Sequence, residues 1–355
     1  MKAAILPLEG EDLQRGADRL RTLVYAEHPA AHDVEWHRSV WSWLGSNPLA
    51  HDMRRWVVAT ADGRVVGHLA AVPQLYRVGG RRVVAHTPAD YQALPGYGFH
   101  AFSLMRRFFR VAENCVAVDQ IREAMAIETA LGAVETGKLE YAAKVLDPSR
   151  LPRMGRRLRP LMRTVRPRIR ALDGALDRLL ANGPQVEELD GFDDSFDDLF
   201  EAVAVGVACV PEKNAAFLRW RYGAACPQPP VTIVGAKEGG TLLGYAVLLA
   251  RADDGSGYIL DLTSRPGRRD VARALLAESV RVFAKAGAYI VRYRFTRSPT
   301  APTRGDLVRL GFFSRGARRH TLLVRFADPV LHEVTSDVSN WSYAVGDGEA
   351  SFWVK

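Results

Sequence analysis

Two distant stretches of the chain share one pattern of apolar and polar positions. WVVATADGRVVGHLAAV at 56–72 alternates with a period of two on both sides of an Asp-Gly pair, which predicts a β-hairpin. VTIVGAKEGGTLLGYAVLL at 231–249 has the same pattern, with Gly67 matched by Gly244. A Pro-Gly turn and an apolar-striped segment, 99–109 or 271–287, follow each hairpin, so each stretch predicts a strand, turn and helix.

The same order of predicted elements extends over most of both copies. A short strand, at 3–8 or 185–190, precedes two helical stretches in each copy. Three strands, a helix, a strand, a helix and a final pair of strands follow. In the first copy Asp33 is placed to cap a helix, and in the second Pro211 suits a first helical turn. We therefore expect an α/β protein with two tandem domains, each a mixed, mostly antiparallel sheet flanked by helices.

A segment of different composition separates the two copies. We expect an N-terminal domain at 1–148, a helical connector at 149–184 and a C-terminal domain with a tail at 185–355. From 150 to 170 there are nine arginines and no acidic residue, within a chain of net charge +8. Such a stretch could contact nucleic acid or an anionic surface, or it could be a solvated linker.

The overall composition limits the class of protein. Apolar residues make up 48% and charged residues 25% of the 355 residues, which predicts packed cores. No apolar run approaches the roughly 18 residues that predict a membrane span, and the N-terminus predicts a strand instead of a signal peptide. The three cysteines are far apart and suggest neither a disulfide framework nor a zinc site. We expect a cytoplasmic protein that needs no metal.

The two turns carry a resemblance to a known family. DYQALPGYGFHAFSLM at 90–105 and DLTSRPGRRDVARALL at 261–276 occupy equivalent places. With Pro-x-Tyr before the helix and Leu-Gly-Ala or Leu-Gly-Phe near the end of each copy, the chain resembles the GNAT superfamily of N-acetyltransferases, in its tandem bacterial form. The resemblance covers about 1–148 and 185–330. It implies two GNAT-like domains and transfer of an acetyl or other acyl group from acyl-CoA to a small-molecule or peptide amine.

The resemblance also implies where the co-substrate binds. In the family, a splayed central strand holds the pantetheine arm, and the following turn and helix N-terminus hold the pyrophosphate. The two glycines of the first turn favour the first copy, although glycine could serve turn geometry alone, and Phe99 and Ala101 stand where further glycines are expected. In the second copy Asp270 is expected to cap the helix. The candidate cofactor-binding residues are Ala93, Leu94, Gly96, Tyr97, Gly98, Phe99 and His100, together with Arg265, Gly267, Arg268 and Arg269.

Candidate catalytic residues are less well defined. The tyrosine that family members use as an acid is absent, since Glu128-Thr129 and Leu307-Val308 occupy its two positions. Asp90 and Asp261 stand at equivalent places before the turns, and His68 follows a hairpin glycine, with Tyr245 as its counterpart in the second copy. Asp90, Asp261 and His68 could each act as a base or serve only as a structural residue.

Several functional readings stay open. The chain could be an acyl-CoA-dependent acyltransferase, an enzyme that takes an aminoacyl group from tRNA, or a non-catalytic pair of domains used for binding. Arg219 and Arg221 flank Trp220 and could bind an acidic substrate or simply be exposed. The tail at 341–355, WSYAVGDGEASFWVK, could add a strand, cover a cleft or pair with a partner chain.

Overall fold

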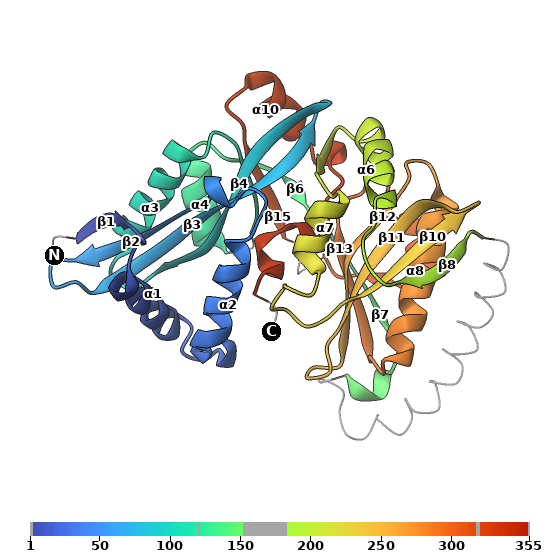
Figure 1. Ribbon diagram of the computed structural model, residues 1–355, viewed down its shortest axis with the longest axis horizontal. Helices are drawn as coiled ribbons and strands as arrows, with labels where there is room; N and C mark the ends of the chain where they lie inside the picture. Colours follow the sequence, from blue (N-terminus) through green and yellow to red (C-terminus); the bar gives the residue numbers. More distant parts are fainter. Residues whose placement is uncertain (1–2, 120, 152–182, 317–319, 354–355) are drawn as a thin grey trace.

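The first copy builds a sheet with helices on its faces (Figure 1). The structure is a computed structural model that describes residues 3–119, 121–151, 183–316 and 320–353. The arginine-rich stretch lies mostly outside these residues. The elements of the first copy are β1 (Ala3–Pro7), α1 (Glu11–Val24), η1 (Pro29–His32), α2 (Val34–Leu44), η2 (Ala50–Asp52), β2 (Arg54–Thr60), β3 (Val65–Val78), β4 (Arg81–Ala93), α3 (Gly98–Val111), β5 (Cys115–Asp119), α4 (Arg122–Ala130), β6 (Val134–Lys138), β7 (Glu140–Val145) and η3 (Pro148–Arg150).

The second copy repeats this order and adds a tail. Its elements are β8 (Gln185–Leu189), α6 (Ser195–Gly206), β9 (Cys209–Pro211), α7 (Ala215–Tyr222), β10 (Thr232–Glu238), β11 (Thr241–Ala250), β12 (Ser256–Ser264), α8 (Arg269–Lys285), β13 (Ile290–Phe295), α9 (Arg304–Arg309), β14 (Phe313–Ser314) and β15 (Thr321–Arg325). The tail contains α10 (Pro329–Thr335), η5 (Val338–Asn340), η6 (Val345–Asp347) and η7 (Glu349–Ser351). The predicted fold class, two mixed sheets flanked by helices, is confirmed.

The two sheets exchange one strand each. In the first sheet the order is β1-β2-β3-β4-β5-β15-β6, so β15 of the second copy lies between two strands of the first. In the second sheet the order is β14-β7-β13-β12-β11-β10-β8, so β7 of the first copy occupies the corresponding place. The exchanged strands pair along their full lengths, from Thr321↔Asp119 to Arg325↔Cys115 and from Ile290↔Val145 to Phe295↔Glu140. The two halves are therefore interlocked.

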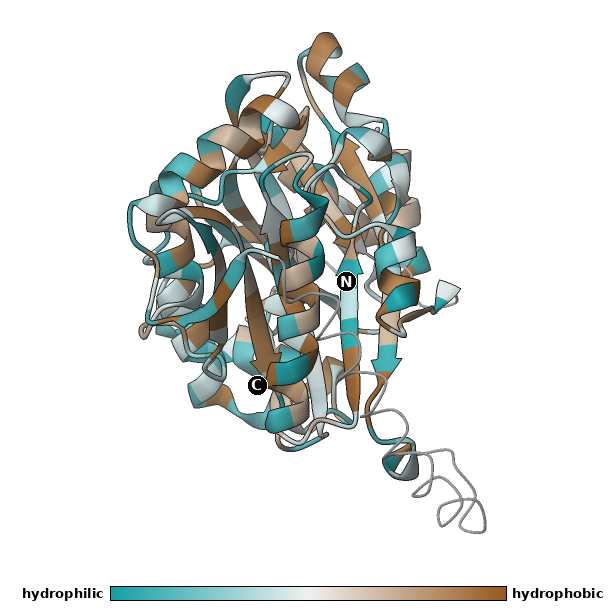
Figure 2. Cartoon of the chain, turned by 90° about the vertical axis from the view of Figure 1, so that its right-hand side faces the viewer, coloured by the Kyte–Doolittle hydropathy of each residue, from teal (hydrophilic) through white to brown (hydrophobic). Residues whose placement is uncertain are grey.

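Matched glycines bring the long helix onto each sheet. A Cβ added at Gly67 would lie 3.2 Å from the Cδ1 atom of Leu104 in α3. One added at Gly244 would lie 3.0 Å from Cδ1 of Leu275 in α8, at the equivalent place in the repeat. Figure 2 shows that the helices carry both hydrophilic and hydrophobic residues while many strand residues are hydrophobic. The apolar helix stripes predicted from periodicity thus pack against the sheets.

The local predictions at helix starts had mixed outcomes. Asp33 caps α2 as predicted, accepting a hydrogen bond from the amide of Trp36 at 2.9 Å. Pro211 does not begin a helix, because it ends β9, which pairs with β3, and α7 starts after the Asn214 cap. Asp270 is not a cap either. It lies in the first turn of α8, where its carboxylate pairs with the guanidinium of Arg268.

Two tryptophans join the two halves. The rings of Trp43 in α2 and Trp220 in α7 are stacked, with centroids 4.8 Å apart and an interplanar angle of 8°. Each indole N–H donates to the other residue's backbone carbonyl, at 2.9 and 3.1 Å. Both hydrogen bonds and the stacked faces hold α2 and α7 in one register. Across the described ranges, no helix has the length and apolar character needed to cross a membrane.

Candidate active site

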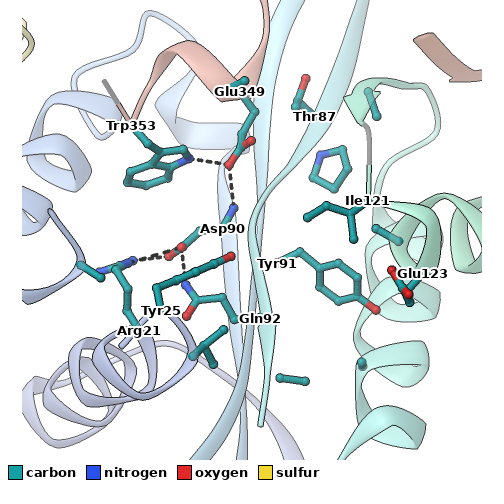
Figure 3. A pocket seen from close by; sticks show the side chains of 18 of the residues that line it. Arg21, Tyr25, Thr87, Asp90, Tyr91, Gln92, Ile121, Glu123, Glu349 and Trp353 are labelled. Atoms are coloured by element: carbon teal, nitrogen blue, oxygen red, sulfur yellow. Dashed lines mark hydrogen bonds and ion pairs between the residues drawn. The ribbon is translucent and has the colours of Figure 1, made fainter. Parts of the chain in front are cut away.

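The first sheet opens between its two central parallel strands. β4 and β5 share the single pairing His86↔Cys115 and then diverge. A cavity of about 710 Å³ lies at this opening (Figure 3). Its lining comes from α1, the η1–α2 region, β4, β5, α4 and the tail, and includes Arg21, Tyr25, His28, Trp36, His37, Asp90, Tyr91, Gln92, Ala93, Gly98, Ile121, Glu123, Ile127, Glu128, His320, Glu349 and Trp353.

A β-bulge in β4 divides the side chains of the cavity between two walls. The register of β3 and β4 shifts between His68↔Gln92 and Ala70↔Ala89, and Asp90 has a backbone φ of 53°. A non-glycine residue in this region is uncommon and is held there by its surroundings. In Figure 3 Asp90 and Gln92 point towards Arg21, whereas Tyr91 points towards α4. The bulge thus presents charged and phenolic groups on opposite sides.

Asp90 is the centre of a buried polar cluster. Its carboxylate forms an ion pair with Arg21 and accepts a hydrogen bond from the amide nitrogen of Gln92. The Nδ1 atom of His68 lies 3.0 Å from the Asp90 carbonyl oxygen and 3.2 Å from its carboxylate. Burial alone would raise the pKa of Asp90, but the charge of Arg21 and the hydrogen bond from His68 outweigh it and hold the pKa below its usual range. The carboxylate therefore stays ionised and positions its neighbours.

The tail delivers a second carboxylate to the same wall. Oε1 of Glu349 accepts a hydrogen bond from the backbone N–H of Asp90 at 3.1 Å and another from the indole of Trp353 (Figure 3). Arg221 anchors this part of the tail, because its guanidinium donates to Oγ of Ser351 at 2.6 Å and lies over the ring of Phe352. Arg221 is only 1% exposed, so it is neither a surface arginine nor free to bind an acidic substrate.

The opposite wall carries a phenol and a carboxyl group. The Tyr91 hydroxyl is buried and has no hydrogen-bond partner among the described residues. Burial, and secondarily the charge of Glu128, raises the pKa of Tyr91, which keeps the phenol protonated. Glu128, where the family's tyrosine was expected, is 1% exposed and lines this wall. A tyrosine is thus present at the cavity, although it comes from β4 instead of α4.

The first predicted cofactor turn lies at one edge of the cavity. Ala93 and Gly98 line it directly, and Gly98 opens α3, with no described atom within 4 Å of an added Cβ. Gly96 has a φ of +89°, which favours glycine. The remaining candidates lie around the turn: Leu94 is buried in the core, Tyr97 is the residue before the helix, Phe99 is 79% exposed and His100 is half-buried.

The equivalent opening in the second sheet is filled by the chain itself. β12 and β13 pair from Ser256↔Ile290 to Ile259↔Tyr293 and then diverge, and the η6 segment of the tail lies between them. Ala344 bridges to Phe295, and a Cβ added at Gly346 would lie 2.7 Å from the Leu260 carbonyl oxygen. The tail therefore covers this opening, one of the three roles that its sequence left open.

Asp261 lies in this filled opening and not at the large cavity. Its carboxylate accepts hydrogen bonds from Nζ of Lys213 at 2.9 Å and from the Tyr245 hydroxyl at 2.7 Å. Asp261 and Tyr245 thus share the arrangement of Asp90 and His68, as the repeat predicts. A catalytic role for Asp261 would require access that its 1% exposure does not give.

The turn of the second copy carries arginines, one of which forms ion pairs within the protein. Arg268 pairs with Glu238 and Asp270, at 3.0 and 2.8 Å, so its charge is compensated without an external anion. Arg265, Gly267 and Arg269 are exposed at the same turn. The arginines there are therefore explained in part by ion pairs within the protein.

The sequence reasoning missed the contributions of the tail, of Tyr91 and of Arg21. Glu349 and Trp353 follow no helical or strand period, and they reach the cavity only because the tail crosses between the sheets. Tyr91 had an available signal, since strand alternation places it opposite Asp90. For Arg21 the sequence signal was weaker: it is a charged residue on the face of an amphipathic helix that also carries the buried residues Ala17 and Leu20.

Comparisons with known proteins identify the fold. A GCN5-related N-acetyltransferase from Anabaena variabilis superimposes with a TM-score of 0.58 at 12% identity, over 92% of this chain and 73% of the other. A probable N-acyltransferase from Enterococcus faecalis gives 0.56 at 11% identity, over 92% and 73%. N-myristoyltransferase of Saccharomyces cerevisiae with bound myristoyl-CoA gives 0.56 at 10% identity, over 91% and 78%.

Sequence comparison adds nothing to this structural likeness. No family model matches the chain, and no curated protein matches it by sequence. The likeness nevertheless extends over about nine-tenths of the chain, at TM-scores of 0.56 to 0.58. The chain therefore has the fold seen in GCN5-related N-acetyltransferases, with one strand exchanged between its two sheets in each direction.

Proposed function

We propose that the protein is an N-acyltransferase that uses acyl-CoA as donor and an amine as acceptor, with its reaction centre in the first copy. The observation that supports this assignment is the contrast between the two openings. The β4–β5 opening forms a cavity of about 710 Å³ with Gly98 at its edge, whereas η6 lies in the β12–β13 opening. The donor would thus bind the first copy, and the second would shape the site through the tail.

The first turn offers a site for the donor's phosphates. Amides at a helix N-terminus carry partial positive charge and attract anions. In α3 the amide of His100 already donates to the Tyr97 carbonyl oxygen, so the amides of Gly98 and Phe99 would face the phosphates. The first turn of α3 contains no acidic side chain that would compete for these amides. The pantetheine arm would then run along the open edge of β4 towards the bulge at Asp90.

The two walls supply the proton transfers that thioester aminolysis needs. The amine nitrogen attacks the thioester carbonyl carbon, so that a C–N bond forms and the C–S bond breaks. Glu349 would accept the proton that the amine loses, held in place by its hydrogen bonds from Asp90 and Trp353. Tyr91 would give its proton to the departing thiolate of CoA. Asp90 and His68 would position the bulge between these groups.

The apolar wall of the cavity bears on which acyl group the donor would carry. The wall near α4 is apolar at Ile121, Ala124 and Ile127, which suits an acetyl or longer acyl chain. Acetyl-CoA and myristoyl-CoA are therefore both informative probes, since one is the donor implied by the family resemblance and the other is bound in a similar solved structure. CoA alone separates recognition of the carrier from recognition of the acyl group.

Thermal unfolding with CoA, acetyl-CoA and myristoyl-CoA tests the proposal. A ligand at 100 times its dissociation constant should stabilise the protein by about 2.7 kcal/mol. Gly98→Glu should abolish this shift by placing a carboxylate at the phosphate cradle. Ser103→Glu adds the same charge farther along α3 and should retain the shift, as should Arg269→Glu in the second turn.

Two results would contradict the assignment. Absence of stabilisation by all three CoA compounds would remove acyl-CoA as the donor. A shift that survives Gly98→Glu but is lost in Arg269→Glu would move the donor site to the second copy.

A further inference from the structure

Two buried side chains at the cavity carry hydrogen-bond acceptors that the protein leaves unused. His37 in α2 is 6% exposed and Gln92 in β4 is 3% exposed, and both line the cavity. Nδ1 of His37 and Oε1 of Gln92 have no hydrogen-bond partner among the described residues. Buried polar atoms are normally paired, so unpaired atoms at one cavity, the Tyr91 hydroxyl among them, indicate a ligand that forms the missing hydrogen bonds.

The protein contacts of each side chain fix the unpaired atom as an acceptor. Nε2 of His37 lies 3.1 Å from the Ala30 carbonyl oxygen, so Nε2 carries the hydrogen and Nδ1 exposes a lone pair. Burial and then the charge of Arg21 lower the pKa of His37 to about 4, which keeps the ring neutral. The amide nitrogen of Gln92 donates to Asp90, which leaves Oε1 as the free acceptor.

The charges around these acceptors disfavour an anionic ligand. Arg21 is the sole arginine or lysine among the described residues that line the cavity, and it is paired with Asp90. Glu349 adds a carboxylate on the same side, held by Trp353. A ligand carboxylate would meet two lone pairs and a like charge here, whereas an ammonium, amine or hydroxyl group would meet acceptors.

We propose that His37 and Gln92 are specificity-determining residues that select an amine acceptor bearing neighbouring hydroxyl or amino groups and no carboxylate. This inference rests on the proposed function and names its acceptor class. Nδ1 of His37 and Oε1 of Gln92 accept hydrogen bonds from these groups and so orient the reacting nitrogen towards Glu349. Amino sugars and amino alcohols have this chemistry, whereas α-amino acids do not.

Three amines of similar size test the acceptor class. Glucosamine has the required donors, cyclohexylamine lacks the hydroxyls, and glucosaminic acid adds a carboxylate. Release of CoA from acetyl-CoA should be fastest with glucosamine. In His37→Leu and Gln92→Leu, KM for glucosamine should rise about tenfold, as expected for one lost hydrogen bond, while acetyl-CoA affinity stays unchanged. His37→Asn, whose side-chain oxygen can replace Nδ1, should recover part of the loss.

The chain offers a matched control for each variant. His86 in β4 also has an unpaired Nδ1, an Nε2 atom 3.4 Å from a carbonyl oxygen and a pKa lowered by burial, but it does not line the cavity. Gln74 in β3 is 7% exposed and likewise lies outside the cavity lining. His86→Leu and Gln74→Leu should leave KM for glucosamine unchanged, and thermal unfolding checks that every variant is folded.

The outcomes separate this inference from the proposed function. Faster transfer to glucosaminic acid or cyclohexylamine than to glucosamine, or an unchanged KM in both cavity variants, would overturn the acceptor class while leaving acyl transfer intact. Failure of CoA, acetyl-CoA and myristoyl-CoA all to bind would remove the proposed function alone. Calorimetric titration of glucosamine into the protein then still decides the acceptor site, because binding lost in His37→Leu and Gln92→Leu supports it and absence of binding overturns it.

Discussion

Replacing Lys213 with methionine should destabilise the protein strongly and in a pH-dependent way. Nζ of Lys213 lies 2.9 Å from the Asp261 carboxylate, 3.2 Å from the Thr263 hydroxyl and 3.5 Å from the Asp347 carboxylate. The lysine side chain is 3% exposed and each aspartate 1%. Methionine keeps most of the apolar stem but removes the charge. Two buried carboxylates would then face each other without a cation.

The size of the effect follows from the uncompensated charge. Removing one partner of a buried ion pair costs about 3–5 kcal/mol. Burial and the charge of Asp261 already raise the pKa of Asp347 to about 6, against the opposing effect of Lys213. Without the lysine this pKa should rise further, so the folded variant will bind a proton near neutral pH.

Urea unfolding at pH 7 and pH 5 measures both parts of the prediction. The folded variant binds a proton that the unfolded chain, with an aspartate pKa of about 3.9, releases. The contribution of this carboxyl group to the variant's stability should therefore rise as the pH falls, by up to about 1.4 kcal/mol per pH unit for one proton. In the parent protein the gain over this interval should be smaller, because Asp347, with its pKa of about 6, binds the extra proton only in the lower part of the interval. The difference in free energy of unfolding between parent and variant should thus be smaller at pH 5 than at pH 7.

Lys237→Met provides the control for a lysine ion pair outside the core. Nζ of Lys237 lies 2.7 Å from Glu187, but these side chains are 32% and 40% exposed. Its removal should change the free energy of unfolding by about 1 kcal/mol or less. A loss of less than about 1 kcal/mol for Lys213→Met, or an equal loss at pH 7 and pH 5, would refute the reasoning for the buried cluster.

Two further predictions concern the pH response and the tail. Burial and the charge of Arg294 lower the pKa of His320 from 6.5 to about 4, so the unfolded chain binds its proton first and acidification from pH 6.5 to 4 should cost up to about 3 kcal/mol. In His320→Gln, the free energy of unfolding measured in urea should fall less between pH 6.5 and pH 4 than in the parent. An equal fall in both proteins would contradict this role of His320. Arg221→Met should destabilise the protein by about 2–3 kcal/mol through lost charged hydrogen bonds to Ser351 and Gln228. Limited proteolysis should then cut within 341–353 while the variant is still folded, and an uncut tail would argue against the anchoring role.

The fold was largely predictable because its elements have clear periods. The two hairpins and the long helices after them follow from alternation, and the matched Gly67 and Gly244 indicate the repeat. Strand exchange was not predictable, because β7 and β15 have the apolar pattern of any buried strand and fit either sheet. Pro211 was placed in a helix from its residue type alone, while the Asn214 cap is the stronger start signal.

Only those residues of the candidate site that lie on the repeated strand and turn were predictable from the sequence. Asp90 was found from its equivalence with Asp261, and Gly98 from the turn motif. Glu349 could not be placed, because it lies in an aperiodic tail whose path depends on the packing of Arg221 and on the buried Lys213. Long-range contacts of this kind leave no local pattern in the sequence.

The exchanged strand β15 has a consequence for synthesis of the protein. The first sheet has a gap between β5 and β6 until β15 arrives, and the paired residues Asp119 and Thr321 are separated by roughly 200 positions along the chain. At a translation rate of roughly 5–20 residues per second, β15 is synthesised about 10–40 s after β5, and the first sheet is incomplete during this time. During that interval β5 exposes an unpaired edge, which is a template for wrong pairing. Emergence of β15 from the ribosome therefore completes the first half as well as the second.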